Sequence, residues 1–264
     1  MQTEGISIDV AMPTYLSEPV LASTLKHLAL SEQAGPVTID TFRVIDNESD
    51  DRTLPIAEER AEHYGWDTDI VSRQCSLPAA RQLAIERVGT DWFLFLDDDV
   101  QIAESYLEDH ANAIAPRIGA LQGRKSIQTT LSAPDPAQQD TETHPSEWVH
   151  QRAFRGGTHA TLIRREAAAS VEFPVDLDVW EDQYLRREIE GNGYLWVFNH
   201  QARFAHVTQN PRPQGWSEGY VQGKYGLRPM WHVCMEVPYA LLSGSAPVAA
   251  AKQAVGYVAG RAGV

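Results

Sequence analysis

The chain has 264 residues, enough for one large domain or two small ones with a substantial core. Hydrophobic residues make up 43% and charged residues 22%, which excludes a disordered or fibrous chain. With 36 acidic against 22 basic residues the formal charge is −14, which argues against nucleic acid as a partner, because Lys and Arg supply most of that affinity.

Only four of the basic residues are lysines. This acidic, lysine-poor composition resembles that of proteins from salt-loving archaea and predicts a halophilic protein. Two cysteines, Cys75 and Cys234, are too few for a disulfide framework and predict a cytoplasmic location. Neither a signal peptide nor an apolar run long enough to span a membrane is expected.

Strand-like and helix-like segments alternate through the first half, a pattern typical of a mostly parallel sheet with crossover helices. Ser17 and Ser76 are expected to cap the first and third helices. The predicted strands are 6–12, 42–45, 68–72, 92–96 and 120–127, and the predicted helices are 18–34, 54–63, 76–88 and 104–114.

The second half predicts strands at 158–163, 194–198 and 203–207, and a helix at 179–190. We expect a catalytic domain over 1–210, with halves at 1–128 and 146–210, a mobile loop at 129–145 and a helical tail at 211–264. The tail carries Trp, Tyr and Met beside Lys and Arg. This composition leaves two alternatives open: peripheral contact with a membrane surface, or packing on the catalytic domain.

Three adjacent carboxylates, Asp97, Asp98 and Asp99, follow the apolar run 92–96. Carboxylates so placed repel one another unless a cation is present. Oxygen ligands of this kind suit Mg²⁺ or Mn²⁺ bridging a diphosphate, and ligands of open α/β sheets bind at the carboxyl ends of strands. A solvated acidic turn is the alternative.

Four features in this order resemble a family 2 glycosyltransferase of the GT-A type: the runs 10–15 (VAMPTY) and 44–51 (VIDNESDD), Arg81, and the run 91–99 (DWFLFLDDD). The resemblance covers about residues 6–207. It implies a GT-A fold, a UDP- or GDP-sugar donor, a DxD motif, and Mn²⁺ or Mg²⁺ as the cofactor.

The resemblance also implies roles for single residues. The implied donor-binding residues are Thr14, Tyr15, Glu18, Asp46, Arg81, Asp97 and Asp98, and the implied metal ligands are Asp99, Asp97 and His206. Other roles stay open for several of them: a core residue for Tyr15 or His206, a helix-start carboxylate for Glu18, a turn former for Asp46, and a surface helix residue for Arg81.

On the acceptor side, Gly156 and Gly157 resemble a small-residue turn beside the acceptor, and Trp180-Glu181-Asp182 resembles the family's "ED" motif at a helix start. The resemblance makes Asp182 the general base of an inverting transfer, with Glu181 as the first alternative. A purely structural role at the helix N-terminus is the other interpretation. The acceptor is expected to be a sugar or a polyprenol-linked glycan.

Two other functions remain open: a non-catalytic nucleotide-sugar-binding module and a nucleotidyltransferase on a similar fold. Having both the carboxylate run and Asp182 argues against the first. The second usually needs a glycine-rich basic loop after the first strand, and residues 13–18 (PTYLSE) lack glycine.

Overall fold

A computed structural model describes residues 5–126, 156–207, 215–243 and 247–263. The chain forms two compact units. The first consists of Met1–Glu172 and Glu188–Gln209, and the second of Phe173–Arg187 and Asn210–Val264. The second unit therefore includes the segment that carries the predicted general base, as well as the C-terminal helices. The loop predicted at 129–145 lies outside the described residues.

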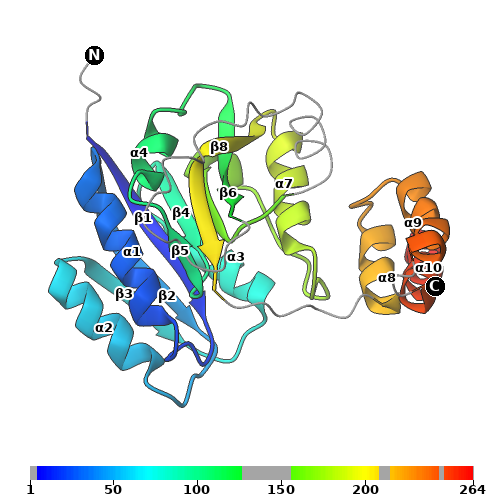
Figure 1. Cartoon of the computed structure of the whole chain (residues 1–264), viewed down its shortest axis with the longest axis horizontal. Helices are drawn as coiled ribbons and strands as arrows, with labels where there is room; N and C mark the ends of the chain where they lie inside the picture. The colour runs from blue at the N-terminus through cyan, green and yellow to red at the C-terminus, as the bar shows by residue number, and fades with distance from the viewer. Residues whose placement is uncertain (1–4, 127–155, 208–214, 244–246, 264) are drawn as a thin grey trace. The chain divides into compact units, whose positions relative to one another are not determined.

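The first unit is built on one sheet (Figure 1). Its strands are β1 (Ile6–Thr14), β2 (Val37–Asp46), β3 (Asp67–Ser72), β4 (Trp92–Leu96), β5 (Val100–Ile102), β6 (Ile118–Lys125), β7 (Ala160–Arg164) and β8 (Leu195–His206). Their order in the sheet is β3-β2-β1-β4-β7-β6-β8-β5. Four of the seven strand pairs are parallel, and β4–β7, β6–β7 and β5–β8 are antiparallel.

Helices flank this sheet, as the alternating pattern predicts. They are α1 (Leu21–Ala34), α2 (Thr53–Tyr64), α3 (Leu77–Arg87), α4 (Tyr106–Ala111) and the short α6 (Arg165–Ala168). α1 packs beside α2 and α4, and α3 packs on β1 and β2. The predicted α/β fold with a mostly parallel sheet and C-terminal helices is confirmed.

The core explains why β4 occupies the middle of the sheet. All five β4 residues are buried, and β1 and β7 pair with its two edges. Leu94 packs in one cluster with Val10 of β1 and with Leu25 and Leu28 of α1. Burying one such side chain stabilises the fold by about 1.5–3 kcal/mol. The apolar β4 therefore anchors the aspartates that follow it.

Two predicted features near the site are wrong in detail. The strands expected at 194–198 and 203–207 are one continuous strand, β8. Ser17 does not cap α1, which begins only at Leu21. Its hydroxyl donates to Asp98 instead, and that long-range bond cannot be read from local sequence. Ser76 does cap α3, accepting a hydrogen bond from Ala79 N at 3.4 Å.

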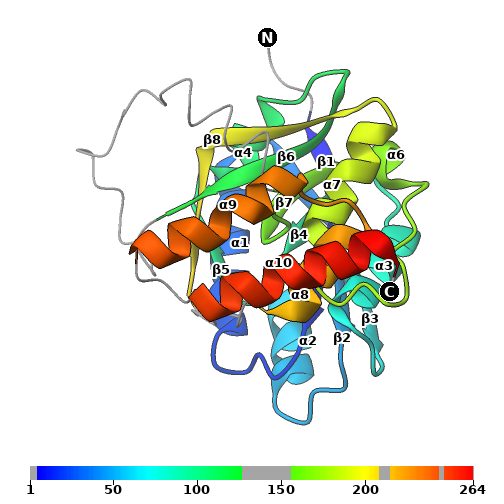
Figure 2. The same ribbon diagram turned by 90° about the vertical axis from the view of Figure 1, so that its right-hand side faces the viewer.

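The second unit holds the C-terminal helices α8 (Trp216–Lys224), α9 (Met230–Ser243) and α10 (Pro247–Ala262), and α7 (Glu181–Gly191) begins in it. α9 and α10 run side by side (Figure 2). α8 and α10 approach closely at glycines: a Cβ on Gly219 would lie 1.9 Å from Gln253 O, and one on Gly256 would lie 2.0 Å from Trp216 O. Side chains at these positions would push the helices apart. Within the described residues, no helix has both the length and the hydropathy needed to cross a membrane.

Candidate active site

Three half-buried aspartates follow β4, and the middle one is held to the segment after β1 by two hydrogen bonds. The Ser17 hydroxyl donates to Asp98 Oδ2, and the Thr24 hydroxyl donates to the Asp98 carbonyl at 2.7 Å. Burial raises the pKa of the Asp98 carboxyl to about 6; the Ser17 bond opposes this rise, and the charges of Asp97 and Asp99 add to it. The strand end therefore concentrates negative charge in a poorly solvated place.

Asp97 lies between two basic side chains. Arg81 Nη2 is 2.9 Å from Asp97 Oδ1, and His159 Nδ1 is 2.7 Å from Asp97 Oδ2. Burial alone would raise the pKa of Asp97, but Arg81 and His159 outweigh it and hold that pKa well below its usual range. Arg81 is only 1% exposed and lies 5.1 Å from the centre of the Phe95 ring. The alternative of a surface arginine is therefore wrong.

His206 joins the same group through strand pairing. It ends β8, which pairs with β5 directly after the aspartates, and its Nδ1 lies 3.3 Å from Asp99 Oδ2. Its ring meets that of His159 edge to face, with centroids 5.0 Å apart. One ligand atom each from Asp97, His159 and His206 lies within 4.8 Å of the others. Carboxylate oxygens and imidazole nitrogens are both common metal ligands, so these residues fit a divalent cation.

His159 is the residue that sequence reasoning missed. It follows the small-residue run Gly156-Gly157-Thr158, which we interpreted only as a turn. A signal was present, because a histidine entering a strand that pairs with β4 lies next to whatever follows β4. The antiparallel pairing of β7 with β4 was not predicted, so this neighbour was not found.

The two glycines that precede Thr158 have a packing role inside the first unit. Gly156 and Gly157 are buried, and a Cβ on Gly157 would lie 2.9 Å from Gln122 Nε2. The Gln122 amide oxygen in turn accepts a hydrogen bond from Trp196 Nε1 at 2.8 Å. The absence of a side chain at Gly157 therefore serves the interior of the first unit, and contact with an acceptor stays a prediction.

Three of the predicted donor-binding residues lie at the end of β1 and in the loop after it. Thr14 is buried, whereas Tyr15 is 58% exposed, so a core role for Tyr15 is excluded. Leu16 follows with a φ of 51°, a left-handed conformation that is uncommon and costs energy for residues other than glycine. Glu18 lies before α1, and its Oε2 accepts a hydrogen bond from Arg52 N at 3.1 Å.

Asp46 ends β2 next to this loop and is fully buried. Its two carboxylate oxygens accept hydrogen bonds from the Thr14 hydroxyl at 3.0 Å, the Ser72 hydroxyl at 2.9 Å, and the Ser49 amide and hydroxyl at 2.9 and 2.6 Å. These bonds support the turn-forming role for Asp46. Binding of a base or ribose by this residue stays a prediction.

The predicted general base lies in the second unit. Glu181 is buried and Asp182 half-buried in the first turn of α7, where Asp182 Oδ1 accepts a hydrogen bond from Gln183 N at 2.7 Å. Trp180 before them has a φ of 65°, a strained value for a bulky residue. Its ring nitrogen donates to Glu218 Oε1 at 2.8 Å. Strained backbone beside two acids is typical of a functional segment.

The structure thus gathers Arg81, Asp97, Asp98, Asp99 and His206 in the first unit, whereas the acids of α7 belong to the second. The mostly parallel sheet, flanked by helices and with acidic groups beyond its central strand, matches the GT-A class of glycosyltransferase folds. Residues 9–170, more than half of the chain, match the family model of glycosyl transferase family 2. The chain belongs to that family.

Several solved structures share the fold of this chain. TarS 1–349 of S. aureus in complex with UDP has a TM-score of 0.60 and 18% identity, over 82% of this chain and 63% of that one. The chain thus spans less than two thirds of that structure. The mannosyltransferase PcManGT from Pyrobaculum calidifontis, in complex with GDP-Man and Mn²⁺, has a TM-score of 0.60 and 15% identity. The match covers 97% of this chain and 75% of that one.

A third structure, glucosyl-3-phosphoglycerate synthase from Mycobacterium tuberculosis with Mn²⁺, UDP and glucosyl-3-phosphoglycerate, has a TM-score of 0.52. Its identity is 17%, over 78% of this chain and 74% of that one. A search of curated protein sequences finds no match. At these identities the neighbours establish the fold alone.

Proposed function

We propose that the protein is a metal-dependent glycosyltransferase that uses a UDP- or GDP-sugar. The observation that carries this proposal is the group formed by Asp97, Asp99, His159 and His206 beyond the buried β4. Family membership and the UDP, GDP-Man and Mn²⁺ in the neighbours' structures support it. We also propose a cytoplasmic location, in keeping with the unpaired Cys75 and Cys234.

Mn²⁺ or Mg²⁺ would be held by Asp99, Asp97 and His206, to which the structure adds His159. A bound divalent cation supplies Lewis-acid stabilisation of the charge on the leaving diphosphate. Arg81 keeps the Asp97 carboxyl ionised and oriented. Asp98 accepts hydrogen bonds from the hydroxyls of Ser17 and Thr24. These bonds join the turn after β4 to the segment that follows β1.

The remaining predicted donor residues, Thr14, Tyr15, Glu18 and Asp46, line the ends of β1 and β2. In this proposal the exposed Tyr15 ring stacks on the base, and the buried Asp46 holds the loop in shape. Ligands of open α/β sheets bind at such strand ends. A preformed loop reduces the entropy lost on donor binding.

The transfer is proposed to invert the anomeric centre. An acceptor hydroxyl oxygen attacks the anomeric carbon, Asp182 removes its proton, and the nucleoside diphosphate leaves with the electrons of the broken bond. A single displacement inverts the configuration. Gly156, Gly157 and Trp180 are the proposed acceptor-side residues, and the acceptor is proposed to be a sugar or a polyprenol-linked glycan.

A hydrolysis screen tests this proposal. UDP- and GDP-sugars are incubated with the protein and Mn²⁺, and free nucleoside diphosphate is measured with and without EDTA. We expect release for one donor class, in Mn²⁺ only. Binding without release for every donor would indicate a binding module instead. Formation of a nucleotide sugar from a sugar phosphate and a nucleoside triphosphate would indicate a nucleotidyltransferase.

The role of Asp182 has its own test. Asp182→Asn keeps size and hydrogen bonding but removes the proton acceptor, so transfer should slow by about 10² to 10⁴. Donor affinity, measured by calorimetry, should stay within a few-fold of wild type. Glu181→Gln is the matched control. Transfer by Asp182→Asn at the wild-type rate would show that another residue is the general base. Loss of donor binding would show that Asp182 belongs to the donor site.

A further inference from the structure

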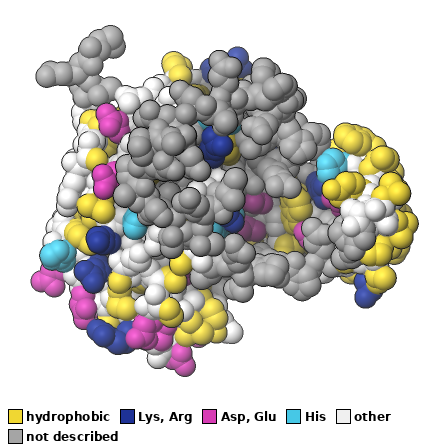
Figure 3. All heavy atoms as spheres, viewed as in Figure 1, with side chains coloured by type: hydrophobic (Ala, Val, Ile, Leu, Met, Phe, Trp, Pro, Cys, Tyr) yellow, Lys and Arg dark blue, Asp and Glu magenta, His cyan; other side chains and the backbone are white. Residues whose placement is uncertain are grey.

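The last two helices expose an unusual amount of apolar surface. On α9 the exposed side chains of Trp231, Met235, Tyr239 and Leu242 recur every three or four residues, so they share one side of the helix. Val248 and Val255 are exposed on α10. We call these six residues the α9–α10 face; Figure 3 shows hydrophobic side chains gathered over these helices.

The opposite sides of the same helices are already used for packing. Val233 and Ala240 of α9 are buried, and Gly256 and Gly260 of α10 lie against the backbone of α8. Leu242, by contrast, is 89% exposed. A helix of a globular protein normally presents polar residues to water, so an exposed apolar face of this size marks an interaction surface.

Charge around this face indicates what the surface binds. Residues 215–264 contain four lysines or arginines and two glutamates, a formal charge of +2 within a chain of −14. Both glutamates face partners within the second unit: Glu218 accepts from Trp180, and Glu236 forms an ion pair with Arg228 at 2.6 Å. Among the described residues of α9 and α10, the exposed charged side chains are Lys252 and Arg261.

We propose that the α9–α10 face docks onto an anionic lipid bilayer surface. Apolar side chains with Trp and Tyr among them enter the boundary between headgroups and acyl chains, and nearby cations attract anionic lipid. A second copy of the chain fits less well, because Lys252, four residues after Val248 on α10, would meet the same positive charge of that copy. The inference sharpens the peripheral membrane contact expected for the tail, and it does not depend on sugar transfer.

Vesicle sedimentation of the full chain tests the proposal. Vesicles of phosphatidylcholine with phosphatidylglycerol are compared with phosphatidylcholine alone, in EDTA and without donor. We expect binding to the anionic vesicles. The double variant Leu242→Asp/Val255→Asp should weaken it by about tenfold or more, because it places charge in the apolar face. Val175→Asp is the matched control, since Val175 is fully exposed in the same unit outside these helices.

A second variant keeps the test decisive should the apolar variant fail to fold, which circular dichroism would reveal. Lys252→Glu changes an exposed position between Val248 and Val255 on α10 and should reduce binding about fivefold. Absence of wild-type binding, or binding that neither variant changes, would overturn the proposal. So would self-association, seen by sedimentation velocity, that Leu242→Asp abolishes while vesicles have no effect. Absence of sugar transfer in a protein that still binds anionic vesicles would contradict only the proposed function.

Discussion

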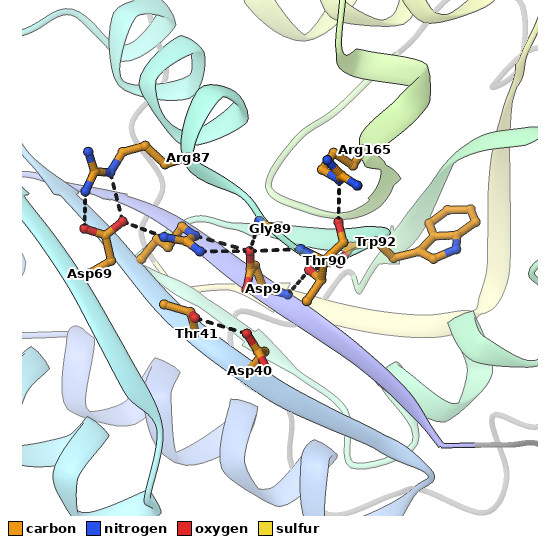
Figure 4. Close-up of polar contacts among 10 residues, drawn as sticks. Asp9, Asp40, Thr41, Asp69, Arg87, Gly89, Thr90, Trp92 and Arg165 are labelled. Atoms are coloured by element: carbon orange, nitrogen blue, oxygen red, sulfur yellow. Dashed lines mark hydrogen bonds and ion pairs between the residues drawn. The ribbon is translucent and has the colours of Figure 1, made fainter.

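Two groups of aspartates in the first unit differ in the side chains that surround them. Asp9, fully buried in β1, accepts hydrogen bonds from Gly89 N at 2.6 Å and from Arg43 Nη2 at 3.1 Å. Arg43 also pairs with Asp69, which pairs with Arg87 (Figure 4). The hydrogen bonds from Arg87 and Arg43 lower the pKa of Asp69. We call Asp9, Arg43, Asp69 and Arg87 the Asp9 network, in which acids and arginines balance.

The group beyond β4 combines three adjacent carboxylates with imidazole groups. Among the described residues, Asp97 pairs with Arg81 at 2.9 Å and with His159 at 2.7 Å, and Asp99 pairs with His206 at 3.3 Å. Adjacent carboxylates in a poorly solvated place repel one another, and a bound cation relieves that repulsion. Acids paired with arginines therefore indicate a structural role, whereas acids grouped with histidines at a strand end indicate a site for a cation.

The largest expected effect comes from breaking the Asp9 network. Arg43→Met removes the cation that pairs with the buried Asp9 carboxylate and should lower the free energy of unfolding by about 3–5 kcal/mol, because it leaves a buried charge uncompensated. Urea unfolding measures this. Mn²⁺ should not restore the loss, since the network lies outside the proposed metal site.

The matched control is Arg52→Met. Arg52 pairs with Glu59 at 3.3 Å, but both side chains are more than 60% exposed. An exposed pair contributes about 0–1 kcal/mol, so this variant should unfold nearly as wild type does. Equal losses for Arg43→Met and Arg52→Met would remove the structural role assigned to the Asp9 network.

The next effect separates stability from binding. Asp99→Asn should weaken Mn²⁺ binding by about 10–100-fold or more, since it removes a proposed ligand. In EDTA the variant should stay close to wild type in stability, because the removal of one of three adjacent charges offsets the loss of the pair with His206. Calorimetry and thermal melting check the two halves. A variant that is destabilised in EDTA and still binds Mn²⁺ normally would reverse the assignment.

The sequence predicts the part of the site that is local. Residues 91–99 identify both the central strand and the carboxylates, because an apolar run and the turn after it are adjacent in the chain. Pairings between distant residues were not predictable in the same way. The Ser17 hydroxyl donates a hydrogen bond to Asp98 instead of capping α1. The antiparallel pairing of β7 with β4 brings His159 next to Asp97. Local propensity contains no information on either contact.

A smaller effect concerns a buried base that has no ionic partner. His110 is fully buried, and its Nε2 has no hydrogen-bond partner among the described residues. Burial lowers its pKa to about 3 in the folded protein, against about 6.5 when unfolded. The unfolded state therefore takes up a proton first as pH falls, and stability drops by about 1.4 kcal/mol per pH unit below about pH 6.5.

Urea unfolding between pH 7.5 and 5 measures this slope. His110→Phe removes the titrating group, keeps an aromatic ring beside Tyr106 and should flatten that part of the profile. A variant profile parallel to that of wild type would show that other groups carry the acid sensitivity. The ion-paired Asp69 should lose its contribution only at lower pH, below its ordinary pKa near 4.

The smallest effect expected is that of salt. The charge of −14 is screened as the Debye length falls to about 3 Å at 1 M salt, so melting temperature should rise between low and molar KCl. The buried Arg43–Asp9 pair should be screened much less, and the Arg43→Met deficit should persist in both salts. A melting temperature independent of KCl would remove the prediction of a halophilic protein.

The most direct test of the central claim is donor binding with and without metal. UDP- and GDP-sugars are titrated into the protein by calorimetry, first with Mn²⁺ and then with excess EDTA. The group of aspartates and histidines beyond β4 predicts binding of one donor class that needs Mn²⁺ and is lost in EDTA. Equal affinity in the two conditions would contradict a cation site at Asp97 and Asp99.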